Sequence, residues 1–275
     1  MKISVGLFLT DIFPHRRRLF NKLVKNKIMG HIPASQAFDS MKKSGVEGIE
    51  LFLPSFNKFT LEDIKDVKKI VEDNTMEVLS VHQALRFFSK TRIAEIAKLF
   101  HMADMLSAKV IVLHLSLAGK QIFDKEYKDT LHSLEKKYGI TIGFENREKY
   151  VITPGGKHNW QGVLFSYLIK ENDFHITFDT THLAATKGDI IKFFKKNKDR
   201  IINIHLSDYK HHVLNGSLRP FRYKHLPLGK GQLPIKKFLE TLREEKYKGL
   251  VTMEIHTNLE GICESARLIS QVIKS

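Results

Sequence analysis

The feature of this sequence that most constrains its fold is a series of short apolar runs, each followed by a segment with helical periodicity. The runs have the length and the β-branched and aromatic content of buried strands, and there are eight, at residues 3–9, 46–53, 77–82, 109–115, 140–145, 175–179, 201–206 and 250–255. Strands that are apolar almost throughout and alternate with helices are typical of a parallel sheet covered by helices. Eight such units in 275 residues predict a single (β/α)8 TIM barrel over residues 1–275 rather than an open doubly wound sheet.

Amphipathic segments between these runs predict the helices that would cover the barrel. They lie at residues 34–44, 60–74, 90–106, 123–139, 159–172, 188–200, 233–247 and 259–275. Thr60 and Asp63 have the spacing of a capping box, and Gly45 is expected to cap the end of the first of these helices. Two connections, 11–33 and 207–232, are long and basic, and in a barrel both would lie on the face where active sites are built.

The sequence also limits the compartment in which the chain is expected to work. Cys263 is the single cysteine, so no intrachain disulfide can form, and a reducing, intracellular setting is expected. The N-terminal apolar run is broken by Asp11 and lacks a cleavage pattern, which indicates a strand rather than a signal peptide. No segment approaches the ~20 apolar residues that span a bilayer. We therefore expect a cytoplasmic protein that does not bind membranes.

The formal net charge of +15 is compatible with an anionic partner, either nucleic acid or a small anionic substrate. Many of the lysines, however, have helix-surface spacing, as in residues 192–200, where a solvated helix face is the simpler interpretation. The charge therefore permits a polyanionic partner without requiring one.

Histidines and carboxylates recur at or just beyond the ends of the predicted strands. They are His82, His114, Glu145, Asp179, His182, His205 and Glu254, and His225 adds an imidazole from the long seventh connection. In a barrel these strand ends converge on one axis, so the side chains would meet in one pocket. A lone core histidine is usually structural, but a cluster of His, Glu and Asp without Cys suits a divalent metal such as Zn, Mn, Co or Mg.

In that order, the strand-end motifs resemble those of the xylose isomerase-like TIM-barrel superfamily. They are SVH (80–82), VLH (112–114), FEN (144–146), FDTTH (178–182), IHLSD (204–208), HLPLGKGQLP (225–234) and MEIH (253–256). That group includes sugar phosphate isomerases and epimerases as well as endonuclease IV, the AP endonuclease family 2. The resemblance implies a common metal held by Glu145, Asp179, His205 and Glu254.

In the isomerase and epimerase branch, the resemblance also makes Glu145 and Glu254 a catalytic acid–base pair on opposite faces of a sugar. A metal that polarises a carbonyl lowers the cost of removing the α-proton and stabilises the enediolate. The four histidines His82, His114, His182 and His225 would then be substrate-binding residues. A phosphate on the substrate could be bound by basic loop residues, although these charges could equally serve solubility; they are Arg16–Arg18, Arg219, Arg222, Lys224 and Lys230.

In the endonuclease IV branch, the same barrel holds three zinc ions. His82 and His114 would bind the first zinc with Glu145, and His182 and His225 would bind the third. The sequence departs from that pattern at Tyr223, where the nuclease has an aspartate ligand for the third zinc. The sequence therefore favours a metal-dependent isomerase or epimerase acting on a sugar or sugar phosphate. The alternatives are an AP endonuclease acting on abasic-site DNA and a metal-binding relative without either activity, while the substrate, the metal and the oligomeric state stay open.

Overall fold

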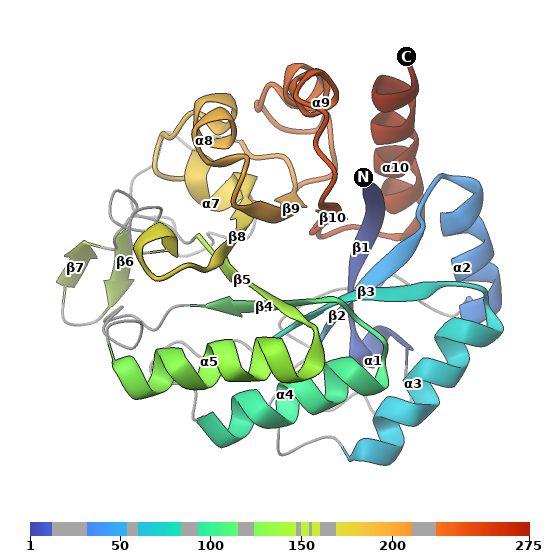
Figure 1. Cartoon of the computed structure of the whole chain (residues 1–275). Helices are drawn as coiled ribbons and strands as arrows, with labels where there is room; N and C mark the ends of the chain where they lie inside the picture. Colours follow the sequence, from blue (N-terminus) through green and yellow to red (C-terminus); the bar gives the residue numbers. More distant parts are fainter. Residues whose placement is uncertain are drawn as a thin grey trace.

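Eight parallel strands close into a barrel in the order β1-β10-β9-β8-β5-β4-β3-β2 (Figure 1). The strands are β1 (Lys2–Phe8), β2 (Gly48–Phe52), β3 (Glu77–His82), β4 (Val110–His114), β5 (Thr141–Glu145), β8 (His175–Asp179), β9 (Ile201–Leu206) and β10 (Leu250–Met253). This computed structural model describes residues 1–12, 32–53, 60–83, 93–114, 124–146, 150–153, 156–159, 169–210 and 224–275. The closed barrel confirms the predicted (β/α)8 architecture, and each predicted strand is present within two residues at either end.

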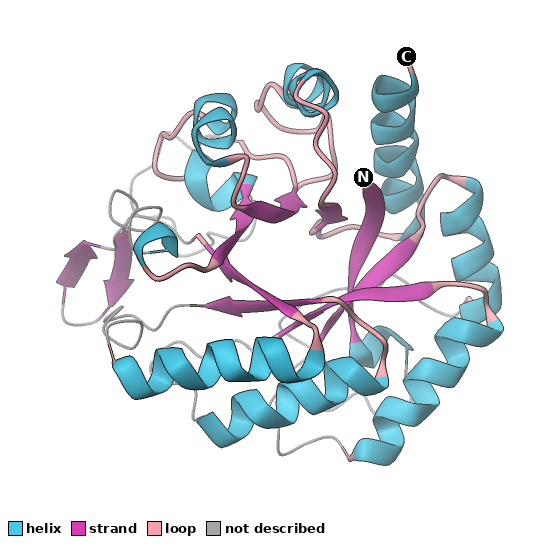
Figure 2. Ribbon diagram, in the orientation of Figure 1, coloured by secondary structure: helices cyan, strands magenta, loops and turns pink. Residues whose placement is uncertain are grey.

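Helices lie around the outside of the barrel (Figure 2). They are α1 (Leu9–Ile12), α2 (Ala34–Lys43), α3 (Leu61–Asp73), α4 (Ile93–Met105), α5 (Lys125–Tyr138), α7 (Thr180–Ala184), α8 (Ile190–Asn197), α9 (Ile235–Glu244) and α10 (Leu259–Lys274). The predicted capping box is present, because the Thr60 side chain accepts from the Asp63 N–H while the Asp63 carboxylate accepts from the Thr60 N–H. Gly45 follows α2 with φ +99°, a conformation that glycine adopts without strain.

One predicted element is wrong at its start. Residue 159 does not begin a helix but ends a two-stranded antiparallel hairpin of β6 (Tyr150–Thr153) and β7 (Gly156–Asn159). The Pro-Gly pair between two short runs is a hairpin signal, and it outweighs the apolar spacing that extended the predicted helix back to residue 159. Most of the remaining predicted range, 160–168, lies outside the described residues.

The core has two parts of different character. Outside the sheet, apolar strand side chains pack against the helices; for example, Phe178 of β8 contacts Phe193 of α8 and Phe238 of α9. Inside the barrel, one layer is polar instead of the branched apolar residues usual in TIM barrels; it contains Ser4, Glu50, Ser80, Asn203 and Thr252, all 0% exposed. This polar layer lies beneath the strand ends.

No helix within the described ranges is both long enough and apolar enough to cross a membrane. The single-domain organisation over residues 1–275 and the cytoplasmic location stay predictions.

Candidate active site and metal centre

The structure places the predicted site residues at one end of the barrel. His82, His114, Glu145 and Asp179 are the last residues of β3, β4, β5 and β8, and His205 is the penultimate residue of β9. Glu254 directly follows β10. Most of these side chains are buried, whereas those of His182 and Glu254 are 17% and 20% exposed. These two side chains are therefore the ones best placed to meet a molecule entering from solvent.

Four residues form the central group, and each offers one ligand atom within 4.8 Å of the other three; they are Glu145, Asp179, His205 and Glu254. His205 Nδ1 lies 2.9 Å from Glu254 Oε2 and 3.4 Å from Glu145 Oε1. Within the described part of the chain, four buried atoms of the group have no hydrogen-bond partner: Asp179 Oδ2, Glu254 Oε2 and both ring nitrogens of His205, of which Nε2 faces Glu50. Buried polar atoms are normally satisfied, so the three atoms other than Nε2 fit a divalent cation with nitrogen and oxygen ligands.

Two further groups flank the central one, and each shares a residue with it. His82, His114 and Glu145 form the first, with His82 Nε2 3.4 Å from Glu145 Oε2 and His114 Nε2 in closer contact with the same oxygen. Asp179, His182 and His225 form the second. All eight predicted site residues are thus brought together.

Other predicted residues cannot be placed in this way. Tyr223, Arg16–Arg18, Arg219 and Arg222 lie outside the described residues. Lys230 is exposed, and Lys224 is partly buried.

Burial and mutual charge set the protonation of the carboxylates in the central group. Burial raises the pKa of Asp179 to about 7, because the negative charges of Glu254 and Glu145 add to the cost of ionisation and His182 offsets this only in part. Burial would likewise raise the pKa of Glu145, but the neighbouring imidazoles, His114 first, hold it well below its usual range. The pKa of Glu254 is lowered in the same way by His225 and His205.

The histidines of the site divide into two kinds. Burial would lower the pKa of His205, but the carboxylates of Glu50 and Glu254 raise it well above its usual range. Burial is similarly outweighed at His182, where Asp179 and Glu145 raise the pKa to about 10. At His225, burial dominates and lowers the pKa to about 3, so this imidazole is neutral at physiological pH.

Residues 38–272 match the family described as xylose isomerase-like TIM barrel. The chain belongs to this family. Family membership confirms the resemblance carried by the strand-end motifs.

Individual relatives of this TIM-barrel chain are distant. An uncharacterized protein of Methanocaldococcus jannaschii is 26% identical over 62% of this chain, and the match spans 58% of that relative's own length. A D-tagatose 3-epimerase-like protein has a TM-score of 0.66 at 19% identity, covering 100% of this chain and 97% of its own. The 3-keto-D-glucoside 4-epimerase of E. coli has a TM-score of 0.65 at 15% identity, with 100% of both chains covered. At these identities the structural matches show a shared fold.

Asn146 fixes the position of Asp179, a role that the sequence analysis of this family member did not predict. Its side chain accepts the Asp179 N–H at 2.7 Å and donates to the Asp179 carbonyl oxygen at 3.0 Å. The Asn146 carbonyl oxygen in turn contacts His182 Nδ1 at 3.0 Å. Asp179 also caps the short helix α7 by accepting the His182 N–H, so its carboxylate cannot rotate freely.

Asp208 holds the segment that carries His225. Its carboxylate accepts backbone N–H groups at 2.8–3.0 Å from Tyr209, Gly229, Gly231 and Leu233. Reciprocal backbone hydrogen bonds of 2.9 and 3.0 Å join Asp208 to Leu226, the residue after His225. A Cβ at Gly231 would lie 2.2 Å from Asp208 Oδ1, so this close approach requires glycine. The IHLSD (204–208) and HLPLGKGQLP (225–234) motifs therefore form one structural unit.

Replacing Asp208 with asparagine should lower the free energy of unfolding by about 2 kcal/mol. The side-chain amide would turn an NH2 group toward two backbone N–H groups, and each buried group left unpaired costs about 1–3 kcal/mol; we expect the lower end because Gly229 and Gly231 are not fully buried. Urea unfolding measures the change. Asp189→Asn is the matched control, since Asp189 accepts two backbone N–H groups at an exposed helix start where asparagine caps equally well. Equal decreases in the free energy of unfolding of the two variants would contradict the role of Asp208 in holding this segment.

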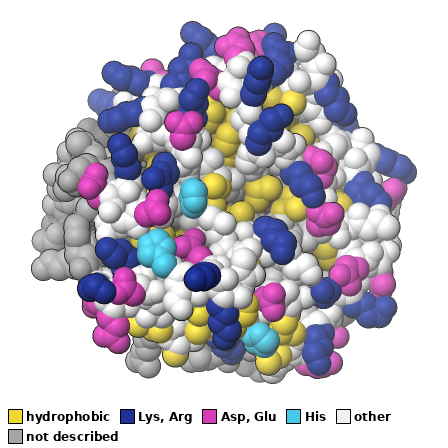
Figure 3. Space-filling view, viewed as in Figure 1, with side chains coloured by type: hydrophobic (Ala, Val, Ile, Leu, Met, Phe, Trp, Pro, Cys, Tyr) yellow, Lys and Arg dark blue, Asp and Glu magenta, His cyan; other side chains and the backbone are white. Residues whose placement is uncertain are grey.

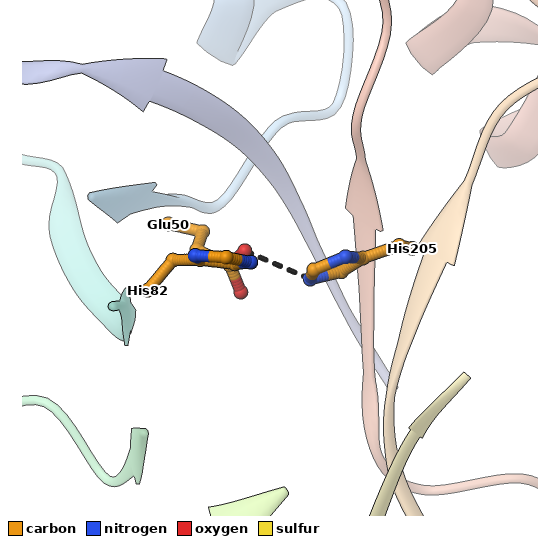
Figure 4. A group of neighbouring side chains, drawn as sticks. All are labelled: Glu50, His82 and His205. Carbon is orange, nitrogen blue, oxygen red and sulfur yellow. Dashed lines mark ion pairs between the residues drawn. The ribbon is translucent and has the colours of Figure 1, made fainter. Parts of the chain in front are cut away.

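Glu50, in the middle of β2, is the site residue that sequence analysis missed. Its carboxylate is fully buried, and its Oε1 forms an ion pair with His205 Nε2 at 2.8 Å (Figure 4). Glu50, His82 and His205 also form a fourth group of nearby ligand atoms. The available signal was a single charged residue within the otherwise apolar run GIELF. Glu50 was missed because only residues at strand ends were considered as site residues.

Proposed function

We propose that this chain is a divalent-metal-dependent isomerase or epimerase of a sugar or sugar phosphate, with Glu145 and Glu254 as its acid–base pair. The observation that carries the proposal is that these two glutamates, from β5 and β10, reach one four-residue ligand group although two other strands, β8 and β9, separate them in the barrel. Two carboxylates that approach a common centre from different sides can act on opposite faces of one carbon atom. The sugar epimerase names of two structural neighbours agree with this chemistry.

Glu145, Asp179, His205 and Glu254 would hold the cation. When bound, it would polarise a substrate carbonyl and the adjacent hydroxyl, which acidifies the α-carbon. Glu254 is ionised at neutral pH because its pKa is lowered, so it can accept the α-proton. Its 20% exposed side chain can reach a substrate that enters from solvent. Glu145 is also ionised, so the proton that it returns from the other side would come from charged His182, whose Nδ1 lies 3.3 Å from Glu145 Oε1. The result is either a new stereocentre or a shifted carbonyl.

The four remaining histidines would orient the sugar. His182 and His225 lie with their ring centroids 5.5 Å apart, and His82 and His114 lie 4.9 Å apart on the other side of Glu145. His225 is neutral, so one of its ring nitrogens can accept a hydrogen bond from a sugar hydroxyl while the other donates. His182 is charged at neutral pH and suits a substrate oxygen that gains negative charge.

An AP endonuclease is the second candidate, and the two flanking ligand groups favour it. Both have three nitrogen or oxygen ligands, which allows more than one cation, and multi-metal centres suit phosphodiester hydrolysis. The net charge of +15 would also suit DNA. Two observations weigh against it: Tyr223 replaces the expected third-zinc aspartate, and on the face in Figure 3 basic side chains are interspersed with acidic ones.

The deciding experiment combines metal stoichiometry with two activity assays on protein purified without chelators. We expect about one Mn, Co, Mg or Zn per chain, exchange of a substrate α-proton with D2O in a panel of ketoses and their phosphates, and no cleavage of an oligonucleotide with one abasic site. Protein stripped with a chelator is the control and should lose exchange. Two or three zinc ions per chain together with a nick on the 5′ side of the lesion would establish the endonuclease instead.

A further inference from the structure

Glu50 is a carboxylate placed where barrel side chains are normally apolar. It is 0% exposed, and its charged partner is the imidazole of His205, with Glu50 Oε1 2.8 Å from His205 Nε2. A buried carboxylate is costly unless its oxygens are paired, so its presence in this layer calls for a role that repays the desolvation.

The second oxygen of Glu50 is held rigidly. Oε2 accepts hydrogen bonds from Ser80 Oγ at 2.6 Å and from Asn203 Nδ2 at 2.8 Å. The orientation of the Asn203 amide is itself fixed, because its Oδ1 accepts from Thr252 Oγ1 at 2.9 Å. The carboxylate therefore presents a fixed oxygen, Oε1, toward the ring of His205.

The His205 ring lies between this oxygen and Glu254, a carboxylate of the central group. Its Nε2 faces Glu50, while its Nδ1 faces Glu254 at 2.9 Å. Figure 4 shows the His205 ring directed at Glu50 and His82, and the His82 ring stacks beside it with a centroid separation of 5.6 Å. The stacked ring restricts rotation of His205, so its two nitrogens keep their separate directions.

We propose that Glu50 is a positioning residue for the metal centre: in the metal-bound state it holds a proton of His205 on Nε2, so that Nδ1 is the nitrogen that binds the cation. An imidazole binds metal only through an unprotonated nitrogen, and a carboxylate on the opposite nitrogen selects that tautomer. The 2.8 Å contact is an ion pair whose direction departs from that of an ideal hydrogen bond. The inference rests on the metal centre of the proposed function but not on the sugar chemistry.

Glu50→Gln tests this tautomer directly. Ser80 and Asn203 both donate to the Oε2 position, so the amide oxygen of the glutamine must occupy it. The NH2 group then faces His205 Nε2, which has to accept rather than donate, and the ring proton moves to Nδ1. We expect the Kd for Co2+ to rise about 10–100-fold, the range typical when a metal-binding histidine loses the carboxylate on its other ring nitrogen.

Thr177→Val is the matched control. Thr177 of β8 is equally buried, and its hydroxyl donates to the Gly143 carbonyl oxygen; among the described residues this hydroxyl forms no hydrogen bond with Glu50, Asn203 or His205. This variant should lower the Tm without changing the Kd for Co2+ by more than about twofold. It therefore separates a general loss of packing or hydrogen bonding from a specific effect on the metal centre.

The measurement is a Co2+ titration of the full chain against a chromophoric chelator, together with the visible absorption of bound Co2+. Support requires a weaker Kd and an altered spectrum in Glu50→Gln, at the wild-type stoichiometry, with Thr177→Val like wild type. An unchanged Kd in Glu50→Gln, or an equal weakening in Thr177→Val, would overturn the positioning role alone. Loss of one full equivalent of Co2+ at saturation would make Glu50 a ligand and overturn it too. Wild-type protein that binds no divalent cation would overturn this proposal together with the metal centre.

Discussion

Glu254→Gln is expected to slow exchange of the substrate α-proton by about 10²–10⁴-fold, the contribution typical of a positioned general base. Glutamine keeps the size of the side chain and an oxygen that can still approach the central group, but it cannot accept a proton. The lowered pKa of Glu254 makes the wild-type side chain fully ionised at neutral pH, so the variant removes a base that is otherwise always available. Mass spectrometry or NMR of deuterium incorporation from D2O measures the exchange.

Loss of the base must be distinguished from loss of the cation, because Glu254 belongs to the ligand group. Metal content is therefore measured on each sample, and exchange is assayed at cation concentrations that saturate the variant. Glu260→Gln is the matched control, since Glu260 is exposed in the first turn of α10 and should leave exchange unchanged. Exchange at the wild-type rate in metal-loaded Glu254→Gln would refute the acid–base role.

The strand ends were the part of the site that the sequence could predict. In a parallel barrel every strand ends on the same face, so a residue's position relative to the end of its apolar run is enough to place it. His82, His114, Glu145 and Asp179 are all final strand residues, and they meet as this rule requires. The rule needs neither the register of the strands nor the conformation of the loops.

Residues that act from below or beside the strand ends could not be found in this way. Glu50 is two residues before the end of β2, and its partners Ser80, Asn203 and His205 come from two other strands, β3 and β9, so the contacts depend on barrel register. Asp208 accepts hydrogen bonds from backbone N–H groups. Nearly every residue type has such a group, so the sequence does not show which residues donate to Asp208. The hairpin β6–β7 was missed because each of its strands has only four residues, and the second, GKHN, has no apolar pattern that would mark it as a strand.

Cation binding at the central group is expected to strengthen steeply as the pH rises from 6 to 8. The pKa of Asp179 is raised to about 7, and that of His205 is raised well above its usual range, so both groups carry protons at the lower end of this interval. A cation needs the ionised carboxylate and the neutral imidazole, so it must displace these protons. The pKa values of Glu145 and Glu254 are lowered, which leaves both glutamates ionised throughout and without influence on the slope.

The sign and size of this effect follow from proton linkage. Each displaced proton lowers the apparent Kd about tenfold per pH unit, which gives two protons per cation below pH 7 and one above it. Titration calorimetry in buffers with different ionisation enthalpies counts the protons released. Asp179→Asn should bind more weakly at every pH but lose one unit of the slope below pH 7, because one of the two titrating ligands is gone. A Kd independent of pH in wild type would show that the cation does not compete with these protons, and a slope unchanged in Asp179→Asn would remove Asp179 from the ligand group.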